Sequence, residues 1–218
     1  RGYIDTIYDE NNHNHAIQSD TSEAPRLVDG SWEFDGEDDY LDVPWGDGYN
    51  KSITISTWIK LNIKSRQHTI VGNYDKTSIN LRLRLEDSEL GAQRYDYDAA
   101  SYEGKTSYNI PENDTWYHVV GAYNLSTGNL SLYVDGKLRD SVVNTVQITQ
   151  EKNYRMGAER KKLNYFNGSI DEVMIFDRAL SENEIQKLYN SCDITENDKL
   201  RCDYPDNVEG KIITIESD

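Results

Sequence analysis

The stretch YFNGSIDEVMIFDRALSENEIQKLYN, residues 165–190, decides the fold because it places an apolar strand directly before a helix. The strand half contains the short apolar run of a buried β-strand, and we expect Ile170 and Val173 to enter a core. Gly168 predicts that this strand approaches its neighbour closely. The first half of the stretch therefore predicts the closing strand of a sheet.

The second half of the stretch carries the start signal of a helix. Ser181 and Glu184 form an S-x-x-E capping box, in which each residue pairs with the backbone of the other. Ile185, Leu188 and Tyr189 share one face of the residues that follow. We expect a short helix whose apolar stripe lies against the edge of the sheet.

Upstream of this stretch, apolar and polar residues alternate in short runs separated by Gly, Asn and Asp, which is typical of β-strands. In SITISTWIKL, residues 52–61, and INLRLRLED, residues 79–87, one face is apolar and is expected to meet a core. The runs at 115–124 and 129–142 predict a hairpin, and the second run turns at the dipeptide Asp135-Gly136, which suits positive φ.

These patterns predict an all-β fold: a two-sheet antiparallel jelly-roll sandwich with one short C-terminal helix. We expect the sandwich and helix to occupy residues 1–190. Residues 191–218 form a tail of different character, in which GKIITIESD, residues 210–218, is able to add one more strand.

The charge of the chain limits its partners. The formal net charge is −16, from 39 acidic and 23 basic residues, and the acids are spread along the whole sequence. Nucleic acid and anionic membranes are therefore disfavoured, since both are bound by basic surfaces. No apolar run is long enough to span a membrane. Bound cations or neutral ligands fit this composition better.

Cysteines and glycosylation sequons indicate the compartment. Cys192 and Cys202 are the two cysteines of the chain; they either form a disulfide that closes a small loop or remain two free thiols. Asn-x-Ser/Thr triplets begin at five positions, namely Asn50, Asn113, Asn124, Asn129 and Asn167. Although the chain opens without a secretory leader, a disulfide and sequons together predict an extracellular or cell-surface location.

Four ordered segments resemble the laminin-G-like or concanavalin-A-like jelly rolls, in the branch shared with pentraxin-like modules. WEFDGEDDYLDVP resembles the first motif of that family, and SITISTWIKL resembles its second. DTWYHVVGAYN with LSLYVDGKL is similar to the family hairpin, and FNGSIDEVMIFDRALSENEI is similar to its closing strand and helix. The resemblance covers roughly residues 3–190 and implies the sandwich fold, in which the first and last motif strands are neighbours.

The resemblance also implies a structural calcium ion, since relatives often hold one near the first and last motifs. Carboxylates that converge with backbone carbonyls form the hard oxygen site that Ca²⁺ prefers. Our candidate ligands are Asp35, Gly36 and Asp38 with Asp171, and with Asp9 or Asn12 as contributors from the N-terminal turn. The alternative is that these acids cap turns and face water.

Carbohydrate binding requires an aromatic platform for sugar faces and planar polar groups for hydroxyls. Our candidates on the polar faces of strands and in the RYDYDAASYEGK segment are Trp58, Arg82, Arg84, Tyr95, Tyr97 and Tyr102. The alternative is that Trp58 and Trp116 pack under loops while the tyrosines lie at strand edges. His118 matches a common histidine of the family, and we expect a hydrogen-bonded structural role for it.

Signatures of catalysis are absent from the sequence. The chain has no E-x-D-x-x-E strand of the retaining glucanases, no Q-[IV]-H strand of the alginate lyases, and no G-x-S-x-G, H-E-x-x-H or phosphate-loop motif. We therefore predict that the protein is not an enzyme.

Two functions fit the sequence. The first is an extracellular recognition or adhesion module that binds glycan or a surface protein, with structural calcium. The second is a structural subunit of a surface filament, sheath or virion, which assembles as a homo-oligomer through its C-terminal strand because an exposed terminal strand can complete a neighbour's sheet.

Overall fold

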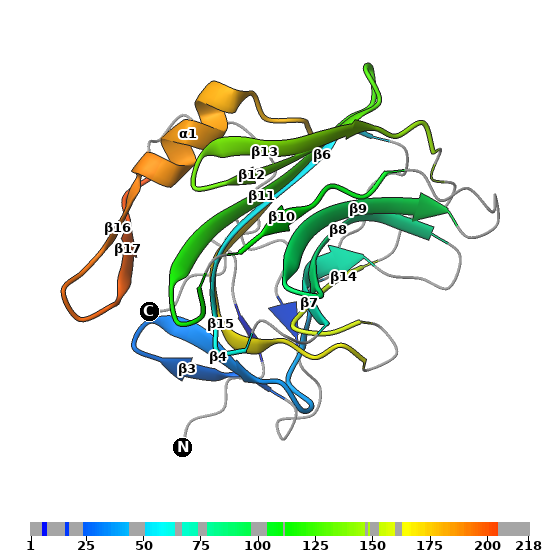
Figure 1. Ribbon diagram of the computed structural model, residues 1–218. Helices are drawn as coiled ribbons and strands as arrows, with labels where there is room; N and C mark the ends of the chain where they lie inside the picture. Colours follow the sequence, from blue (N-terminus) through cyan, green and yellow to red (C-terminus); the bar gives the residue numbers. More distant parts are fainter. Residues whose placement is uncertain are drawn as a thin grey trace.

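The fold was analysed in a computed structural model (Figure 1), which describes residues 6–7, 16–17, 24–43, 51–63, 67–73, 78–96, 104–110, 112–146, 148, 153–159 and 163–204. The described residues form two large antiparallel sheets, one helix and one small hairpin. The predicted all-β sandwich with a single C-terminal helix is confirmed.

Sheet A has eight strands. Their spatial order is β1 (Thr6–Ile7), β2 (Ala16–Ile17), β5 (Leu41–Val43), β14 (Tyr154–Met156), β7 (His68–Asn73), β8 (Ser78–Glu86), β9 (Glu89–Asp96) and β10 (Tyr108–Asn109). β8 and β9 are strongly curved in Figure 1, on the side of the molecule away from the helix.

Sheet B has seven strands. Their order is β13 (Lys137–Val143), β12 (Asn129–Val134), β11 (Trp116–Asn124), β6 (Ile53–Leu61), β15 (Asn167–Phe176), β4 (Ser31–Asp35) and β3 (Arg26–Val28). β11 and β12 form the predicted hairpin, and β12 turns into β13 at the predicted Asp135-Gly136 dipeptide. Both turn residues have positive φ, at 53° and 68°. This pair of angles matches the tight turn that the Asp-Gly dipeptide favours.

The core lies between the two sheets and draws on every central strand. Residues at alternate positions point into it, including Ile55 and Ile59 of β6 and Leu81, Leu83 and Leu85 of β8, all fully buried. The period-two interpretation of both strands is therefore confirmed.

The closing strand β15 pairs with β4 on one side and with β6 on the other, so the first and last motif strands are neighbours as expected. Ile170 and Val173 are both in the core, although their spacing of three breaks the period of two. A β-bulge resolves this conflict: the register shifts between Asp171 and Met174, and Glu172 has φ +50°.

Helix α1 (Glu182–Asn190) begins at the predicted capping box. Ser181 accepts from the backbone of Glu184, and the Glu184 carboxylate accepts from the backbone of Ser181 at 2.8 Å. Ile185 and Leu188 pack on the outer face of sheet B, with Val120 of β11 and Met174 of β15, and not against the edge of the sheet as expected. In Figure 1, α1 lies beside β12 and β13. Among the described residues, no helix is long and apolar enough to cross a membrane.

The tail continues directly from α1 into a hairpin of β16 (Cys192–Ile194) and β17 (Leu200–Cys202). Cys192 and Cys202 form a disulfide, as one of the two interpretations of the sequence predicted. The hairpin also packs on sheet B, against Trp58 and Trp116. The additional strand predicted at residues 210–218 lies outside the described residues.

Candidate functional site

The outer face of sheet A carries a row of polar residues that runs across five strands. Pairing registers place Asp42 of β5 opposite Arg155 of β14, Arg155 opposite Gly72 of β7, Gly72 opposite Arg82 of β8, and Arg82 opposite Gln93 of β9. The residues beside them, such as Leu41 and Leu83, point into the core, so alternation directs this row outward.

Ion pairs hold the side chains of this row in place. The Arg82 guanidinium donates to Glu159 Oε1 at 2.7 Å and to Gln93 Oε1 at 2.7 Å. Arg155 forms a bidentate pair with Asp42, at 2.6 and 2.8 Å, and lies 4.0 Å over the ring of Tyr40. Charge-assisted bonds of this kind are strong and directional. We call Asp42, Arg155, Glu159, Arg82 and Gln93 the polar row.

Glycine at position 72 leaves room for the centre of the row. A Cβ atom at Gly72 would lie 2.7 Å from Arg82 Cβ, so the stem of the arginine lies across the glycine. The row is therefore built for one arrangement of the Arg82 side chain.

A second group lies beside the row, formed by Arg84 and Glu86 of β8 and by Lys105, which bridges to Gln93 of β9. Arg84 pairs with Glu86 at 2.9 Å, and Lys105 pairs with Glu86 at 2.8 Å. The pKa of the Glu86 carboxyl lies below its usual range, chiefly because Lys105 donates a hydrogen bond to it. Arg82 and Arg84, which the sequence nominated together, thus share one face, although both are largely buried.

The aromatic candidates for sugar binding do not lie together on one surface, because Tyr95 is on sheet A and Trp58 is on sheet B. Tyr95 follows Gln93 by two positions on β9 and is partly buried, so it lies close to the row. Tyr97 and Tyr102 lie outside the described residues. Trp58 is on β6 of the opposite sheet and is 3% exposed, so its place in a common binding surface with Arg82 was wrong.

Trp58 is covered by α1 and by the hairpin that follows it. Its indole stacks on Tyr189 of α1, with ring centroids 5.8 Å apart, and contacts the buried Cys192. The alternative that Trp58 and Trp116 pack under loops is right that both are buried, but the segments that cover them are α1 and the β16–β17 hairpin. His118, next to Trp58, is buried and bonded to Ser56 at 2.9 Å, which confirms its structural role.

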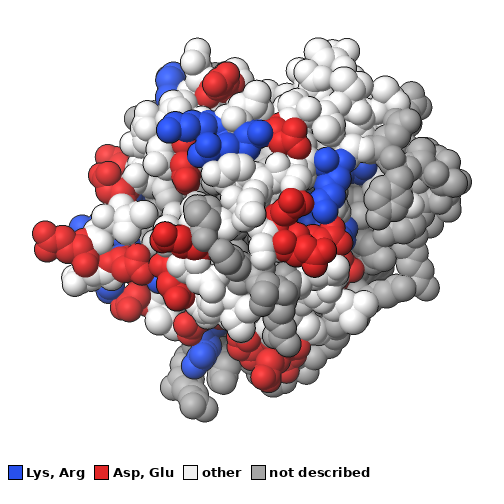
Figure 2. Space-filling model, viewed as in Figure 1, with Lys and Arg blue, Asp and Glu red and all other residues white. Residues whose placement is uncertain are grey.

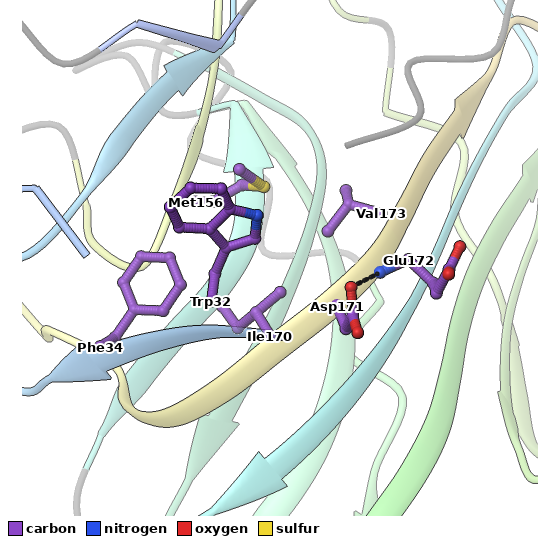
Figure 3. Close-up of a pocket in the computed structure, with 7 residues that line it drawn as sticks. All are labelled: Trp32, Phe34, Met156, Ile170, Asp171, Glu172 and Val173. Carbon is purple, nitrogen blue, oxygen red and sulfur yellow. Dashed lines mark hydrogen bonds between the residues drawn. The ribbon is translucent and has the colours of Figure 1, made fainter. Parts of the chain in front are cut away.

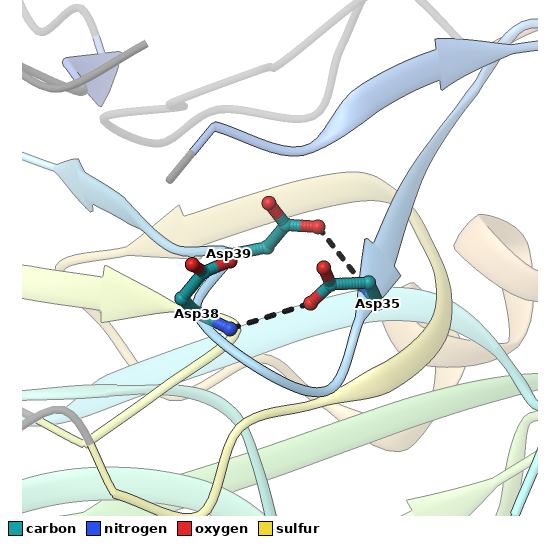
Figure 4. Close-up of side chains that lie close together, drawn as sticks. All are labelled: Asp35, Asp38 and Asp39. Carbon is teal, nitrogen blue, oxygen red and sulfur yellow. Dashed lines mark hydrogen bonds between the residues drawn. The ribbon is translucent and has the colours of Figure 1, made fainter. Parts of the chain in front are cut away.

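Three carboxylates converge in the turn between β4 and β5 (Figure 4). Asp35, Asp38 and Asp39 each place an oxygen within 4.8 Å of the other two. Asp35 accepts from the backbone of Glu37 at 2.7 Å, and Asp39 accepts from the backbone of Asp35 at 2.9 Å. The cluster therefore contains turn caps, as one interpretation predicted, and also the oxygen atoms that a hard cation prefers.

Asp39 is the member of this cluster that the sequence did not single out. Burial raises the pKa of its carboxyl to about 6, and the negative charges of Asp35 and Asp38 act in the same direction. A divalent cation would relieve both effects. The signal in the sequence was the adjacent pair Asp38-Asp39, in which the second aspartate precedes a buried strand.

The other predicted calcium ligands are not part of this cluster. Asn167, not Asp171, is the β15 residue paired with Asp35, and its side chain donates to the Asp35 carbonyl and fills the space beside Gly36. Asp171 lies further along β15, opposite Trp58. Its carboxylate accepts a hydrogen bond from the backbone N–H of Glu172 at 2.9 Å. Asp9 and Asn12 lie outside the described residues.

A narrow pocket lies beside the β15 bulge (Figure 3). It is lined by Trp32, Phe34, Met156, Ile170, Asp171, Glu172 and Val173, and it is too narrow to hold a water molecule. Trp32, Phe34 and Met156 gather on one side, and the two acids lie on the strand opposite. The pocket is a packing feature of the core edge and offers no space to a ligand.

The predicted sequons differ in their accessibility. Asn113 and Asn129 are exposed. The Asn124 side chain accepts a hydrogen bond from the backbone of Ser126 at 3.0 Å, and the Asn167 amide donates one to the Asp35 carbonyl. Asn50 lies outside the described residues. A glycan on Asn167 would have to displace an existing contact, whereas Asn113 and Asn129 present no such barrier.

Surface charge follows the composition. Figure 2 shows acidic side chains spread over one face of the molecule, with the basic side chains in small groups between them. Over the described residues in this view there is no continuous basic area of the kind that binds nucleic acid.

The two curved sheets, the short helix and the polar outer face define a jelly-roll module of the lectin type. A laminin G family, described as the concanavalin A-like lectin/glucanases superfamily, matches residues 35–186, and the chain belongs to this superfamily. The family resemblance of the four motifs is thereby confirmed. No curated protein matches the sequence.

Solved structures share the fold at low sequence identity. A heptameric SAP-like pentraxin from Limulus polyphemus is 19% identical, with a TM-score of 0.58 over 84% of this chain and 95% of its own. The binding domain of botulinum neurotoxin serotype D is 16% identical, with a TM-score of 0.63 over 86% of this chain and 51% of its own. A candidate carbohydrate-binding protein from Bacteroides ovatus is 18% identical, with a TM-score of 0.56 over 74% of this chain and 47% of its own. The chain thus spans about half the length of the last two.

Proposed function

We propose that the protein is a non-catalytic recognition module that binds glycan through the polar row on sheet A and serves adhesion at the cell surface or outside the cell. The observation that carries the proposal is the row itself. Its guanidinium, amide and carboxylate groups are planar, are fixed by mutual hydrogen bonds, and lie on one outer face of a lectin-type sandwich.

The chemistry of the row suits sugar hydroxyls. The side chain of Asp42 is 44% exposed, so its carboxylate can accept from a hydroxyl while Arg155 holds it in position. Lys105, with 34% of its side chain exposed, supplies a donor at the opposite end of the same face. A row of fixed donors and acceptors gives orientation at little cost in side-chain entropy.

Two of the structural relatives support a binding function. One is described as a candidate carbohydrate-binding protein, and for botulinum neurotoxin type C cell entry is described as dependent on two ganglioside molecules. The superfamily also includes glucanases, so membership alone does not exclude catalysis. The absence of a catalytic carboxylate pattern in the sequence favours the binding function.

We further propose that Asp35, Asp38 and Asp39 hold a calcium ion. Three carboxylates within 4.8 Å and a buried Asp39 fit a hard divalent cation, which would supply fixed positive charge to this turn. The pairing of Cys192 with Cys202 and the two exposed sequons support an extracellular location. The alternative of a filament subunit stays a prediction, because it rests on residues 210–218, outside the described part of the chain.

The test is glycan screening of the full chain together with the variant Arg155→Lys. Lysine keeps the charge but loses the planar fork that holds Asp42, so we expect binding to weaken by about tenfold with little change in thermal stability. Arg26→Lys, the same substitution on β3 of the opposite sheet, is the matched control and should bind like the unsubstituted chain.

Two results would contradict the proposal. One is an array with no bound glycan for the full chain, and the other is binding that Arg155→Lys leaves unchanged.

A further inference from the structure

His68 and His118 are the two histidines in the described part of the chain, and their buried rings meet opposite surroundings. His118 shares a hydrogen bond with the Ser56 hydroxyl through Nε2, and its Nδ1 has no partner among the described residues. Burial lowers the pKa of this imidazole to about 3, so it is neutral at neutral pH. His68, at the start of β7, is also fully buried, but both of its ring nitrogens are bonded.

Both partners of the His68 ring are backbone carbonyl oxygens. Nδ1 lies 3.0 Å from the Tyr165 oxygen, and Nε2 lies 2.7 Å from the Ile63 oxygen. A carbonyl oxygen only accepts hydrogen bonds, so each of these two nitrogens must carry a proton. Neutral imidazole has one N–H group, and both nitrogens are donors only in the imidazolium cation. The two contacts together therefore require a charged His68 ring.

The charged side chains of the neighbouring strands are directed away from this ring. His68 is paired with a core residue of β8 and points into the sandwich. Arg84 and Glu86 of β8 pair with each other on the outer face of sheet A, and Lys60 of β6 extends from the outer face of sheet B. Tyr165 is the titratable residue beside the ring, and its carbonyl makes the contact. Two charge-assisted hydrogen bonds offset the cost of burying the cation.

One of the two carbonyls belongs to a loop that contacts the polar row. We call residues 157–159 and 163–166 the Glu159 loop. Its two arms are joined by the Glu159 N–H, which donates to the Leu163 oxygen at 2.9 Å. The Glu159 carboxylate accepts from Arg82 at 2.7 Å, and the Glu159 carbonyl accepts from Arg155 at 3.3 Å. The loop thus contacts both arginines of the polar row.

We propose that His68 is a pH-sensitive lock on the Glu159 loop: its imidazolium form holds the loop against the end of β6 and so keeps the polar row ready to bind glycan. When the ring gives one proton to solvent, Nε2 keeps the shorter contact with Ile63, and the contact with Tyr165 is lost. The lock is therefore closed at low pH and opens as the pH rises through the titration of His68. This regulation of binding rests on the function proposed above for the polar row.

Other contacts limit how far the loop can move. The Thr69 N–H still donates to the Asn164 oxygen at 2.9 Å, and the Gly157 N–H to the Ile70 oxygen at 3.0 Å. Opening of the lock therefore loosens the loop without releasing it. We expect glycan binding to weaken by about fivefold, which is the effect of one lost hydrogen bond.

The first measurement is the long-range ¹H–¹⁵N NMR spectrum of the labelled full chain, which shows which ring nitrogens of each histidine carry a proton. At about pH 7.5 an ordinary imidazole is mostly neutral. We expect two protonated nitrogens in the His68 ring at this pH and one in the His118 ring. His68→Gln and His118→Gln assign the signals by removing them. A His68 ring that is neutral at this pH, or that stays charged up to about pH 10, would overturn the lock.

Amide hydrogen exchange then reports on the loop in the absence of any glycan. When His68 loses its proton, the protection of the Glu159 N–H should fall severalfold. The control is the Gly128 N–H, which donates to the Asn124 oxygen at 2.8 Å in a turn of sheet B, and its protection should stay constant. The same change at both amides, or at neither, would show that His68 does not hold the loop.

Two substitutions at His68 separate the two contacts of the ring. The amide nitrogen of asparagine lies near the position of Nδ1, and that of glutamine lies near the position of Nε2. His68→Asn therefore keeps a donor for Tyr165, His68→Gln keeps one for Ile63, and neither side chain takes up a proton. We expect His68→Asn to bind glycan equally well at every pH, and His68→Gln to bind about fivefold more weakly at every pH.

Binding is measured with labelled full-length protein on a printed glycan array, one pH unit below and one above the NMR midpoint of His68. The unsubstituted chain should bind about fivefold more weakly at the higher pH. A fall of the same size in His68→Asn would overturn the lock as its cause. An array that stays blank at both pH values would contradict the function proposed for the polar row and its regulation. The spectrum and the exchange data still decide whether His68 holds the loop, so the two failures are distinguishable even if a variant does not fold.

Discussion

Burial determines the ionisation of His118. The imidazole lies beside Tyr189 of α1, shares a hydrogen bond with the Ser56 hydroxyl at 2.9 Å, and has its pKa lowered to about 3 by desolvation. In the unfolded chain the same group titrates near 6.5. Between these two values the unfolded state binds one more proton than the folded state, so the free energy of unfolding falls as the pH falls.

We therefore predict that the free energy of unfolding falls as the pH falls from 6.5 to 3, and that this fall is smaller in His118→Gln. Glutamine preserves a hydrogen bond to Ser56 but takes up no proton. From about pH 6.5 to about pH 4.5 the unsubstituted chain should lose about 2 kcal/mol more of its unfolding free energy than the variant, measured by urea titration. Equal losses in both proteins would show that His118 is protonated in the folded state.

Asp39 contributes with the opposite sign in part of this range. Its folded pKa is raised to about 6 from an ordinary 3.8, so the folded state binds the extra proton between these values. Stability from this group is complete below pH 3.8 and is lost as the pH rises through 6. The comparison with His118→Gln removes this effect, because Asp39 is present in both proteins.

At the scale of elements, the approach of β15 to β6 depends on one glycine. Gly168 has φ +145°, and a Cβ atom there would lie 2.1 Å from the Lys60 carbonyl oxygen. Backbone cannot move aside as a side chain can. Gly168→Ala should therefore lower the free energy of unfolding by about 3 kcal/mol or more. Urea titration measures this free energy as the product of the midpoint concentration and the m-value.

Gly136→Ala is the matched control for this prediction. Its φ is also positive, at 68°, but the nearest atoms belong to the flexible end of the Gln186 side chain. We expect a loss of only about 1 kcal/mol, as for a left-handed glycine whose neighbouring side chain can move aside. If the two variants lost the same stability, close strand contact would not be the reason for glycine at position 168.

The sequence predicted these elements well because their signals are local. A capping box fixes the start of α1, and alternation fixes the inward faces of β6 and β8. What covers the outward faces could not be predicted, since it depends on where α1 and the hairpin dock. Trp58 is the example: alternation correctly placed it outward, and only the tertiary contact with Tyr189 and Cys192 makes it buried.

The candidate calcium site shows the same limit in another form. That β4 and β15 are neighbours was predicted, but the register between them was not, and it places Asn167 instead of Asp171 beside Asp35. Register in this sheet depends on the bulge at Glu172 and on pairing across the whole sheet. The polar row was found only in part for a related reason, because Arg82 and Arg155 come together from strands far apart in the sequence.

On the scale of the whole molecule, stability should depend on cations in two separable ways. With a net charge of −16, the folded chain repels itself, and any salt screens this repulsion. A calcium site at Asp35, Asp38 and Asp39 would add a specific effect, since a ligand that binds only the folded state raises its stability.

Thermal unfolding in potassium chloride with and without calcium separates the two effects. Raising potassium chloride from about 10 mM to about 300 mM should raise the Tm by a few degrees in every variant. Calcium chloride at about 1 mM, added at the higher salt, should raise the Tm by about 5 °C more. This value holds for a dissociation constant of about one hundredth of the added calcium concentration. Asp38→Asn should abolish the calcium step, and Asp177→Asn, an exposed aspartate outside the cluster, should retain it. A calcium step that is absent in the unsubstituted protein, or that persists in Asp38→Asn, would assign the three carboxylates to turn capping alone.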